Sequence, residues 1–254
     1  MDDIFFISLR SGSSGNGYII SDGVDSILFD AGIPKKLILQ VANEHNIPLP
    51  SNLLISHEHT DHIKNLNVIT RTLNPTVYST AGTLGAILHH IRDSEIFPVS
   101  PGSEISIGKF AVRFIPTPHD SAQPVSFLTE HISGKKIALI TDIGNPCENV
   151  IHSVRGANII LIESNYEPRL LKESTYPSTL KTRIAGKYGH LSNIQCVDFV
   201  QRFYHHKLQT VILGHLSENN NRPELAFGRI RPIIPFLVDL HIAHRYEPMI
   251  FRCE

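Results

Sequence analysis

Four side chains of the kind that bind metals, packed into six residues, constrain this chain more than any other part of its sequence. They follow the short apolar run 53–55 and read His57-Glu58-His59-Thr60-Asp61-His62. Imidazole nitrogens and carboxylate oxygens are common ligands of divalent metals in proteins. In an extended turn His57 and His59 share one direction, and Asp61 and His62 follow at a helix start in a second direction. The cluster predicts two metal sites that serve a hydrolysis.

Two such sites need ligands from elsewhere, and three candidates each follow a predicted strand. His119 comes after a strand and two stiffening prolines, Asp142 stands at a strand end, and His215 directly follows a third apolar strand. Open sheets gather their sites just beyond strand ends. Each signal is weak alone, because Asp142 could cap a helix near residue 146 and His119 could lie in an ordinary turn.

Short strands and helices are interleaved along the chain, with strands dominating the first part. Hydrophobic periodicity and turn residues predict strands at 4–9, 18–20, 26–29, 53–55, 77–79, 105–115 (two strands around a turn at 108–109), 125–131, 136–140, 159–162 and 210–213. They predict helices at 34–45, 62–72, 81–91 and 192–204. Two mixed sheets with outer helices are the natural packing for this order. The expected fold class is α/β, an αββα sandwich in a single domain over residues 1–254.

The composition is that of a soluble globular protein. Apolar residues make up 41% and charged residues 19% of the 254 residues, and no run approaches the roughly 18 to 20 apolar residues of a membrane span. A net charge of −1 argues against non-specific coating of DNA, but it permits a local basic groove. The acidic start lacks the basic residues of a secretory signal, and three scattered cysteines fit a reduced, cytoplasmic protein.

The ordered series of motifs resembles the metallo-β-lactamase fold superfamily over nearly the whole chain. The series is Asp30, His57-x-His59-x-Asp61-His62, His119, Asp142 and His215. It is most similar to the bacterial WalJ/YycJ-type proteins in Ser11-Gly12-Ser13-Ser14-Gly15-Asn16, His119-Asp120, Thr141-Asp142-x-Gly144, Glu163-Ser164-Asn165, Gly189-His190-Leu191-Ser192-Asn193 and Gly214-His215-Leu216-Ser217. Members of that group are regarded as metal-dependent phosphodiesterases with 5′-to-3′ DNA exonuclease activity linked to mismatch repair.

The resemblance implies how the ligands divide between two divalent metal ions, for which zinc, manganese and iron are all suitable. One ion would be held by His57, His59 and His119, and the other by Asp61, His62 and His215, with Asp142 bridging both. Asp30 would be a buried residue that braces the ligand loop. Without the resemblance, Asp30 could simply start the turn that follows it.

His190 and Asp61 are the expected catalytic residues. The motif around His190 is similar to one that supplies a catalytic histidine in tRNA-processing and cyclic-phosphate relatives, where it contacts the scissile phosphate and acts as general acid. The motif could also only cap the following helix, and a capped helix start suits an anion as well. The backbone amides of loop 11–17 could line the metal cleft or belong to a flexible hairpin.

A basic stretch leads into His190 and is the expected rim of a groove for a phosphate backbone. Residues 166–189 contain five basic and two acidic residues, a local charge of +3, namely Arg169, Lys172, Lys181, Arg183 and Lys187 against Glu167 and Glu173. Basic residues of this kind are equally often found on solvated helix faces. The expected substrate-binding residues are Ser13, Asn16, Lys181 and Arg183.

These features together predict a dinuclear metal-dependent phosphodiesterase, a 5′-to-3′ DNA exonuclease that uses a metal-bridging hydroxide. Its partners would be DNA and DNA-repair proteins rather than a membrane, and the oligomeric state stays open. The main alternative is a small-molecule hydrolase of the same fold that acts on a cyclic phosphate, a thioester or a lactone, because hydroxide attacks phosphoryl and carbonyl centres alike. A further alternative is a weakly active metal-binding partner in a repair complex.

Overall fold

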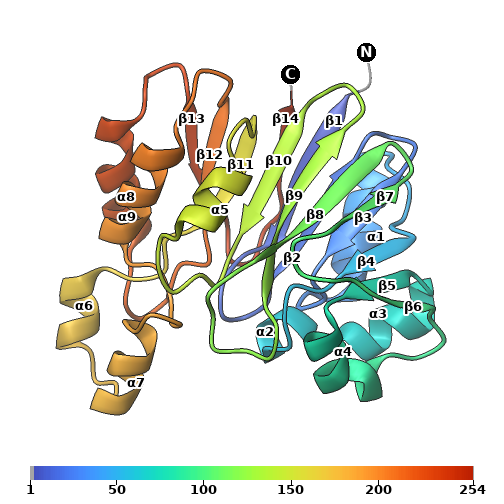
Figure 1. The fold of residues 1–254 in the computed structure, drawn as a ribbon, viewed down its shortest axis with the longest axis horizontal. Helices are drawn as coiled ribbons and strands as arrows, with labels where there is room; N and C mark the ends of the chain where they lie inside the picture. The colour runs from blue at the N-terminus through green and yellow to red at the C-terminus, as the bar shows by residue number, and fades with distance from the viewer. Residues whose placement is uncertain (1–2, 254) are drawn as a thin grey trace.

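The computed structural model describes residues 3–253 as two β-sheets packed face to face between two layers of helices (Figure 1). The first sheet has seven strands in the order β14-β1-β2-β3-β4-β5-β6. Its strands are β1 Ile4–Arg10, β2 Gly17–Ser21, β3 Ser26–Phe29, β4 Asn52–Leu54, β5 Thr76–Ser79, β6 Ile96–Pro98 and β14 Met249–Cys253. The second sheet has seven strands in the order β13-β12-β11-β10-β9-β8-β7. Its strands are β7 Glu104–Ile107, β8 Phe110–Pro116, β9 Val125–His131, β10 Lys136–Ile140, β11 Ile159–Glu163, β12 Thr210–Gly214 and β13 Asp239–Ile242.

Both sheets are mixed, and each combines antiparallel hairpins with a parallel half. In the first sheet β14, β1, β2 and β3 pair antiparallel, whereas β3 to β6 run parallel. In the second sheet β7 to β10 pair antiparallel, and β10 to β13 run parallel. It follows that β8, β10, β11 and β12 all point the same way, so their carboxyl ends lie on one edge. The predicted fold class is confirmed.

Helices cover the outer face of each sheet. The helices are α1 Lys35–Glu44, α2 Thr60–Ile63, α3 Leu66–Leu73, α4 Ala81–Ile87, α5 Glu148–Ser153, α6 Pro168–Glu173, α7 Ser178–Ile184, α8 Asn193–Phe203 and α9 Pro223–Ile230, with 3₁₀ turns at Leu88–His90 and Arg231–Ile233. Helices α1, α3 and α4 pack on the first sheet, and α5, α8 and α9 on the second. Helices α6 and α7 project from one edge of the sandwich (Figure 1). Within residues 3–253, none of these helices has the length and apolar character that a membrane span needs.

The core consists of three layers of buried apolar side chains that follow from this order. The layer between the sheets is rich in aromatic residues, and Phe29 of β3 meets Phe127 of β9 with ring centroids 5.2 Å apart. Phe114 of β8 contacts Phe127 edge-on at the same distance of 5.2 Å. Such ring pairs add to the free energy gained by burial. The two sheets are therefore held rigidly against each other beneath their shared edge.

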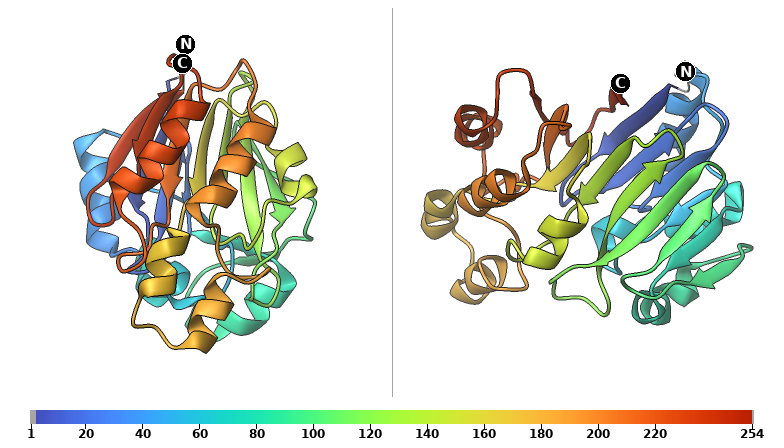
Figure 2. Two further views of the ribbon diagram at one scale, coloured as in Figure 1. Left: turned by 90° about the vertical axis from the view of Figure 1, so that its left-hand side faces the viewer. Right: turned by 45° about the horizontal axis from the view of Figure 1, so that its top comes forward.

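The first and last described strands lie side by side. β1 pairs antiparallel with β14, with Ile4 opposite Cys253 and Ser8 opposite Met249. In the left view of Figure 2, the blue strand β1 and the dark red strand β14 reach the top of the molecule, and the yellow and orange helices α6 and α7 lie at the bottom. One edge of the first sheet thus depends on the end of the chain.

The predicted helix at 62–72 is wrong as a single element. The chain forms α2 and α3 with a break between them, because the Asn65 amide donates to the Ala31 carbonyl oxygen rather than continuing the helix. The predicted helix at 81–91 also ends early, at Ile87, and continues as a 3₁₀ turn. Elements that carried no clear periodicity were not predicted, namely α5, α6, α7, α9, β6, β13 and β14.

Candidate metal centre

The candidate ligands lie in loops that directly follow strands and meet at one edge of the sandwich. His57 follows β4, His119 follows β8, Asp142 follows β10 and His215 follows β12. Asp30 follows β3 in the same way. Because β8 and β10 to β12 run in one direction in the second sheet, and β3 and β4 are parallel in the first, these strand ends gather on one side, the lower side of Figure 1 beside α2. The topology brings every predicted ligand to one place.

Three of these residues adopt a backbone conformation that is unfavourable for side chains other than glycine. Asp30, Asp142 and His215 have φ angles of 60°, 54° and 53°. This left-handed region costs a non-glycine residue roughly 1–2 kcal/mol. Strain of this kind persists where the surrounding structure fixes it and is often found at functional sites. Each of the three turns is held in place by the strand before it.

The first group of candidate ligands is His57, His59 and His119, with ligand atoms that lie within 4.8 Å of one another. His119 Nδ1 is 2.9 Å from the Gly189 carbonyl oxygen, so this nitrogen donates and leaves Nε2 with a free lone pair. Burial holds the pKa of His57 well below its ordinary value and lowers the pKa of His119 as well. Both rings are therefore neutral near pH 7, the state in which imidazole binds a cation.

A buried brace orients two of the imidazoles. Asp30 Oδ2 accepts from His62 Nδ1 at 2.7 Å, and Asp30 Oδ1 accepts from the backbone amide of Ser56 at 2.8 Å. The Ser56 hydroxyl donates its one proton to Asp30 and so accepts from His57 Nδ1 at 2.9 Å. In both rings Nε2 is then the nitrogen left for the cluster. The position of Asp30 fits the bracing role expected for it, and Ser56 is a part of the brace that the sequence did not indicate.

The second group is Asp61, His62 and His215, which again has its ligand atoms within 4.8 Å of one another. His215 Nε2 lies 3.1 Å from Asp61 Oδ2 and His62 Nε2 lies 3.6 Å from the same oxygen. The Asp61 side chain is 21% exposed, compared with 0% and 3% for the two histidines. Asp61 is thus the member of this group that faces solvent.

Asp142 lies between the two groups and is almost fully buried. Its Oδ2 is 3.0 Å from His62 Nε2, and its Oδ1 is 3.7 Å from His119 Nε2. Among residues 3–253, neither Asp142 Oδ2 nor His57 Nε2 has a hydrogen bond of good geometry, although both are buried. An unsatisfied buried polar atom costs roughly 1–3 kcal/mol unless something binds it. Two orphaned ligand atoms in a cluster of imidazoles and carboxylates fit divalent cations.

The pKa values of the second group also fit the binding of a divalent cation. Burial alone would lower the pKa of His62, but Asp30 and Asp142 raise it well above its ordinary value. Burial disfavours the charged form of His215, but Asp142 favours it, and the pKa of His215 is raised to about 10. Without a metal, these two rings hold protons as counter-ions to the carboxylates. A cation of higher charge would replace them.

Glu163 is the main site residue that was not predicted. It is fully buried at the end of β11, and its Oε1 is 2.7 Å from His190 Nδ1 and 2.9 Å from His215 Nδ1. Its Oε2 accepts the backbone amides of Ile143 and Leu191, each at 3.1 Å. Burial opposes the charge on His190, but Glu163 raises its pKa. The rule that identified Asp142, a polar residue at the end of an apolar strand, applied equally to Glu163.

A small cavity of about 220 Å³ opens above these residues. It is lined by Ser13, Asp120, Asn165, Tyr176, Leu180, Arg183, Ile184, Gly189, His190 and Ser217. Ser13 and Arg183, two of the residues expected to bind substrate, line this cavity together with His190. Asp120, for which no role was predicted, pairs with Arg183 and lies 3.5 Å from His119 Nε2. This pair ties the loop of His119 to α7.

Two residues predicted to bind substrate have other contacts. Asn16 is fully buried, and its side-chain amide donates to Asp61 Oδ2 at 2.9 Å, so it positions a ligand instead of facing the cavity. The Lys181 ammonium donates to the carbonyl oxygens of Lys172 and Ser174 and does not line the cavity. Both side chains therefore already have partners within the protein, which the sequence alone does not indicate.

The predicted helix cap next to His190 is present as well. Ser192 is the N-cap of α8 and forms a capping box with Gln195. His190 lies just before this cap with its side chain 22% exposed. Capping and a place in the cavity are therefore compatible, as the sequence allowed. The alternative cap role of Asp142 is excluded, because α5 begins after Cys147.

Comparisons of the sequence with known proteins agree with this geometry. The family model described as Beta-lactamase superfamily domain matches residues 25–215. Exodeoxyribonuclease YycJ of Bacillus anthracis is 33% identical over 228 residues, which cover 88% of this chain and 86% of that protein. Exodeoxyribonuclease WalJ of Streptococcus pneumoniae is 31% identical over 226 residues, which cover 86% of this chain and 83% of that protein.

Solved structures share the fold at low sequence identity. The metallo-beta-lactamase fold protein YhfI from Bacillus subtilis aligns with a TM-score of 0.76 at 13% identity, covering 99% of this chain and 100% of that one. Human tRNase Z, short form, aligns with a TM-score of 0.68 at 12% identity, covering 98% and 99% of the two chains. At these identities the similarity establishes the architecture and nothing about substrate.

Proposed function

The chain belongs to the metallo-β-lactamase superfamily, among the metal-dependent hydrolases that include exodeoxyribonucleases YycJ and WalJ, and we propose that it is a dinuclear phosphodiesterase that degrades DNA from the 5′ end. The observation that carries the proposal is the pair of ligand groups around Asp142, with the Glu163–His190 contact beside them. The 5′-to-3′ direction of degradation in this proposal rests on the resemblance to the WalJ/YycJ-type group.

In this proposal the first group and the second group each hold one divalent ion, zinc, manganese or iron, and Asp142 is shared between them. The ligands are His57, His59 and His119 for one ion, and Asp61, His62 and His215 for the other. Such ions supply positive charge for the phosphoryl oxygens and make water a better nucleophile near neutral pH. Asp30 orients His62, and Asn16 orients Asp61, each through a hydrogen bond to the side chain.

His190 is the proposed proton donor. Its Nδ1 is taken by Glu163, which leaves Nε2 for the substrate, and the ring lines the cavity. Glu163 favours the protonated ring, so His190 can stabilise charge on a phosphate oxygen and then pass a proton to the leaving oxygen. After the transfer, the buried carboxylate keeps the ring in the same orientation for the next proton.

Asp61 is the proposed second catalytic residue. It is the exposed carboxylate of its group, and Asn16 fixes its Oδ2 with a hydrogen bond of 2.9 Å. A carboxylate held in this way can accept a hydrogen bond from the attacking water and orient it. Asp61 and His190 would then serve the two ends of an in-line displacement.

The proposal extends to residues 1–254 as a single hydrolase domain, to a cytoplasmic location and to DNA-repair proteins as partners. The free state of Cys147, Cys196 and Cys253 supports a reducing compartment. The names of the two bacterial relatives support DNA as the polymer.

The test combines elemental analysis of the purified protein with digestion of 5′-labelled and 3′-labelled single-stranded oligonucleotides. We expect about two equivalents of metal per chain and release of the 5′ label as the first product. An Asp142→Asn variant, which removes the shared charge, is expected to abolish turnover. Retention of the 5′ label while the 3′ label is released first would reverse the polarity, and DNA that stays intact would reject the nuclease assignment.

A small phosphodiester is the second candidate substrate, and one observation favours it. The cavity beside His190 measures only about 220 Å³, below the roughly 300–1,000 Å³ that is usual for ligand sites. Turnover of bis-p-nitrophenyl phosphate and of a cyclic nucleotide, compared with an oligonucleotide and a thioester, separates these possibilities.

A further inference from the structure

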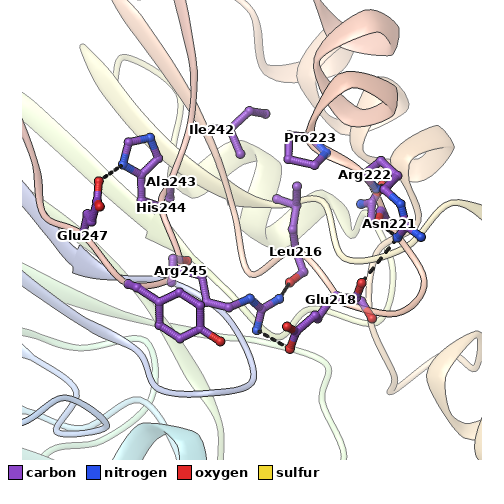
Figure 3. Close-up of a pocket in the computed structure, with 13 residues that line it drawn as sticks. Leu216, Glu218, Asn221, Arg222, Pro223, Ile242, Ala243, His244, Arg245 and Glu247 are labelled. Atoms are coloured by element: carbon purple, nitrogen blue, oxygen red, sulfur yellow. Dashed lines mark hydrogen bonds and ion pairs between the residues drawn. The ribbon is translucent and has the colours of Figure 1, made fainter.

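A second, larger cavity of about 640 Å³ lies next to the metal centre (Figure 3). Its floor is apolar and is formed by Leu216, Pro223, Ile242 and Ala243. Five of the other lining residues are exposed, namely Glu218, Arg222, His244, Tyr246 and Glu247, whereas Ser217 and Arg245 are half-buried and Ser11 and Asn221 are buried. The proposed function gives this cavity no role, although its size is typical of a ligand site.

The two cavities share one lining residue. Ser217 lines both of them, two residues after the candidate ligand His215. Ser11 lines the larger cavity, and its hydroxyl accepts the His215 backbone amide at 2.8 Å. A molecule that fills the larger cavity therefore contacts Leu216 and Ser217, the two residues that follow the candidate ligand His215.

Arg245 lines the larger cavity and contacts Ser13, which lines the smaller one. Its guanidinium donates to the Leu216 carbonyl oxygen at 2.6 Å (Figure 3). It also donates to the Ser13 hydroxyl at 3.4 Å. Gly12 packs against this guanidinium, since a Cβ at residue 12 would lie 3.1 Å from Arg245 Nη1. The side chain thus links the 11–17 loop, which borders the metal centre, to the loop after β12.

The charges of the cavity suit an uncharged flat group better than a phosphate. Glu218 lies 4.0 Å from the Arg245 guanidinium, and Glu247 lies 3.9 Å from His244. The Arg222 guanidinium donates to the carbonyl oxygens of Glu218 and Asn221. A phosphate would meet these carboxylates as well. An apolar floor with polar groups at the rim instead matches a nucleobase, which has apolar faces and a polar edge.

Tyr246 is the aromatic side chain that a base could stack on. It is 57% exposed at the opening, and the Arg10 guanidinium lies 5.9 Å from its ring centroid. Exposed aromatic rings with a nearby arginine are the usual surface for single-stranded nucleic acids. Their stacking tolerates every base, because each base has a π-face.

We propose that this cavity binds a nucleobase of the single-stranded substrate, from a nucleotide next to the one being cleaved. This proposal rests on the proposed function in taking single-stranded DNA as the ligand, but it does not depend on hydrolysis of that DNA. The phosphate then passes over Ser217 and Arg245 into the small cavity, where His190 lies. The base cavity lets an enzyme with a small catalytic pocket hold a long strand in register.

The test uses 3′-labelled hexanucleotides in which a single abasic site is moved from position to position. Binding of hydrolysis-resistant phosphorothioate versions to the metal-loaded protein is measured by fluorescence anisotropy. The variants are Tyr246→Ala, which removes the ring, and Ile242→Trp, which fills the floor. Tyr204→Ala is the matched control, because Tyr204 is 42% exposed and lines a separate cavity.

In the unaltered protein we expect one position at which loss of the base weakens binding about tenfold, equivalent to about 1.4 kcal/mol. In both variants this penalty should fall below about twofold, and in the control it should stay near tenfold. Equal binding of all abasic oligonucleotides by the unaltered protein, or a penalty that survives in both variants, would overturn the proposal. A protein that binds in this way but leaves DNA uncut would reject the nuclease assignment and keep the base site.

Discussion

Oε1 of Glu163 lies 2.7 Å from Nδ1 of His190, and the carboxylate that makes this contact is completely buried. A partner on Nδ1 fixes both the tautomer and the plane of the ring, and the solvent-facing nitrogen is then Nε2. Because the same carboxylate also binds His215, the proposed acid and a proposed metal ligand share one anchor. Geometry at one of them is therefore sensitive to changes at the other.

Replacing His190 with alanine is expected to remove transition-state stabilisation and to leave the metals in place. The loss should be about 2–4 kcal/mol, a turnover number about 30- to 1000-fold lower, by analogy with other single charge-stabilising donors. The measurements are kcat on bis-p-nitrophenyl phosphate and metal content. His152→Ala is the matched control, since that side chain is 62% exposed on α5. Full activity of His190→Ala would rule out the proposed acid.

Removing the brace behind the ligands is expected to weaken metal binding before it changes the fold. Asp30→Asn leaves His62 Nδ1 and the Ser56 hydroxyl with a poorer acceptor, and loss of such outer contacts typically costs 10- to 100-fold in metal affinity. Competition with a chelator of known affinity measures the change. The exposed Asp93→Asn variant is the control. An unchanged affinity would show that Asp30 only stabilises the loop.

Metal loading should release protons. His62 and His215 have raised pKa values in the metal-free protein, with that of His215 at about 10, so both rings are charged at pH 7. A cation requires neutral imidazole, and we expect about two protons to leave on binding. Calorimetry in buffers with different ionisation enthalpies counts them. A buffer-independent heat at pH 7 would contradict this account, and the count should fall as the pH approaches 10.

The three thiols should differ in reactivity, and one of them should make stability depend on alkaline pH. Burial raises the pKa of Cys196 to about 12, whereas an unfolded thiol ionises at about 8.5. Its contribution to stability is therefore complete below about pH 8.5 and is lost as the pH rises toward 12. Iodoacetamide at pH 8 followed by mass spectrometry should label the half-buried Cys147 first and spare Cys196. Rapid labelling of Cys196 would mean that α8 opens easily.

The ligand positions could be predicted from the sequence because each is local. A polar residue directly after an apolar strand, as with His119 and His215, needs only the strand to be placed correctly. The common direction of β8, β10 and β12 then brings those residues together.

The contacts that could not be predicted depend on residues far apart in the chain. Whether Asn16 faces the substrate or Asp61 is decided by the docking of loop 11–17 against α2. Lys181 carried the right charge, but nearby carbonyl oxygens hold its ammonium group. Likewise, β13 and β14 are edge strands with mixed burial, so they lack the alternation that marks half-buried strands.

The pairing of β1 with β14 has a consequence for how the protein is made. A ribosome releases β1 first, and its outer edge has no neighbour until the last strand emerges. Through most of synthesis that edge exposes unpaired backbone groups, which other nascent chains can join. Metal ligands up to His215 are already available by then. Closure of this sheet edge therefore follows the synthesis of the reactive centre, and shortening β14 should cause aggregation before it causes loss of metal.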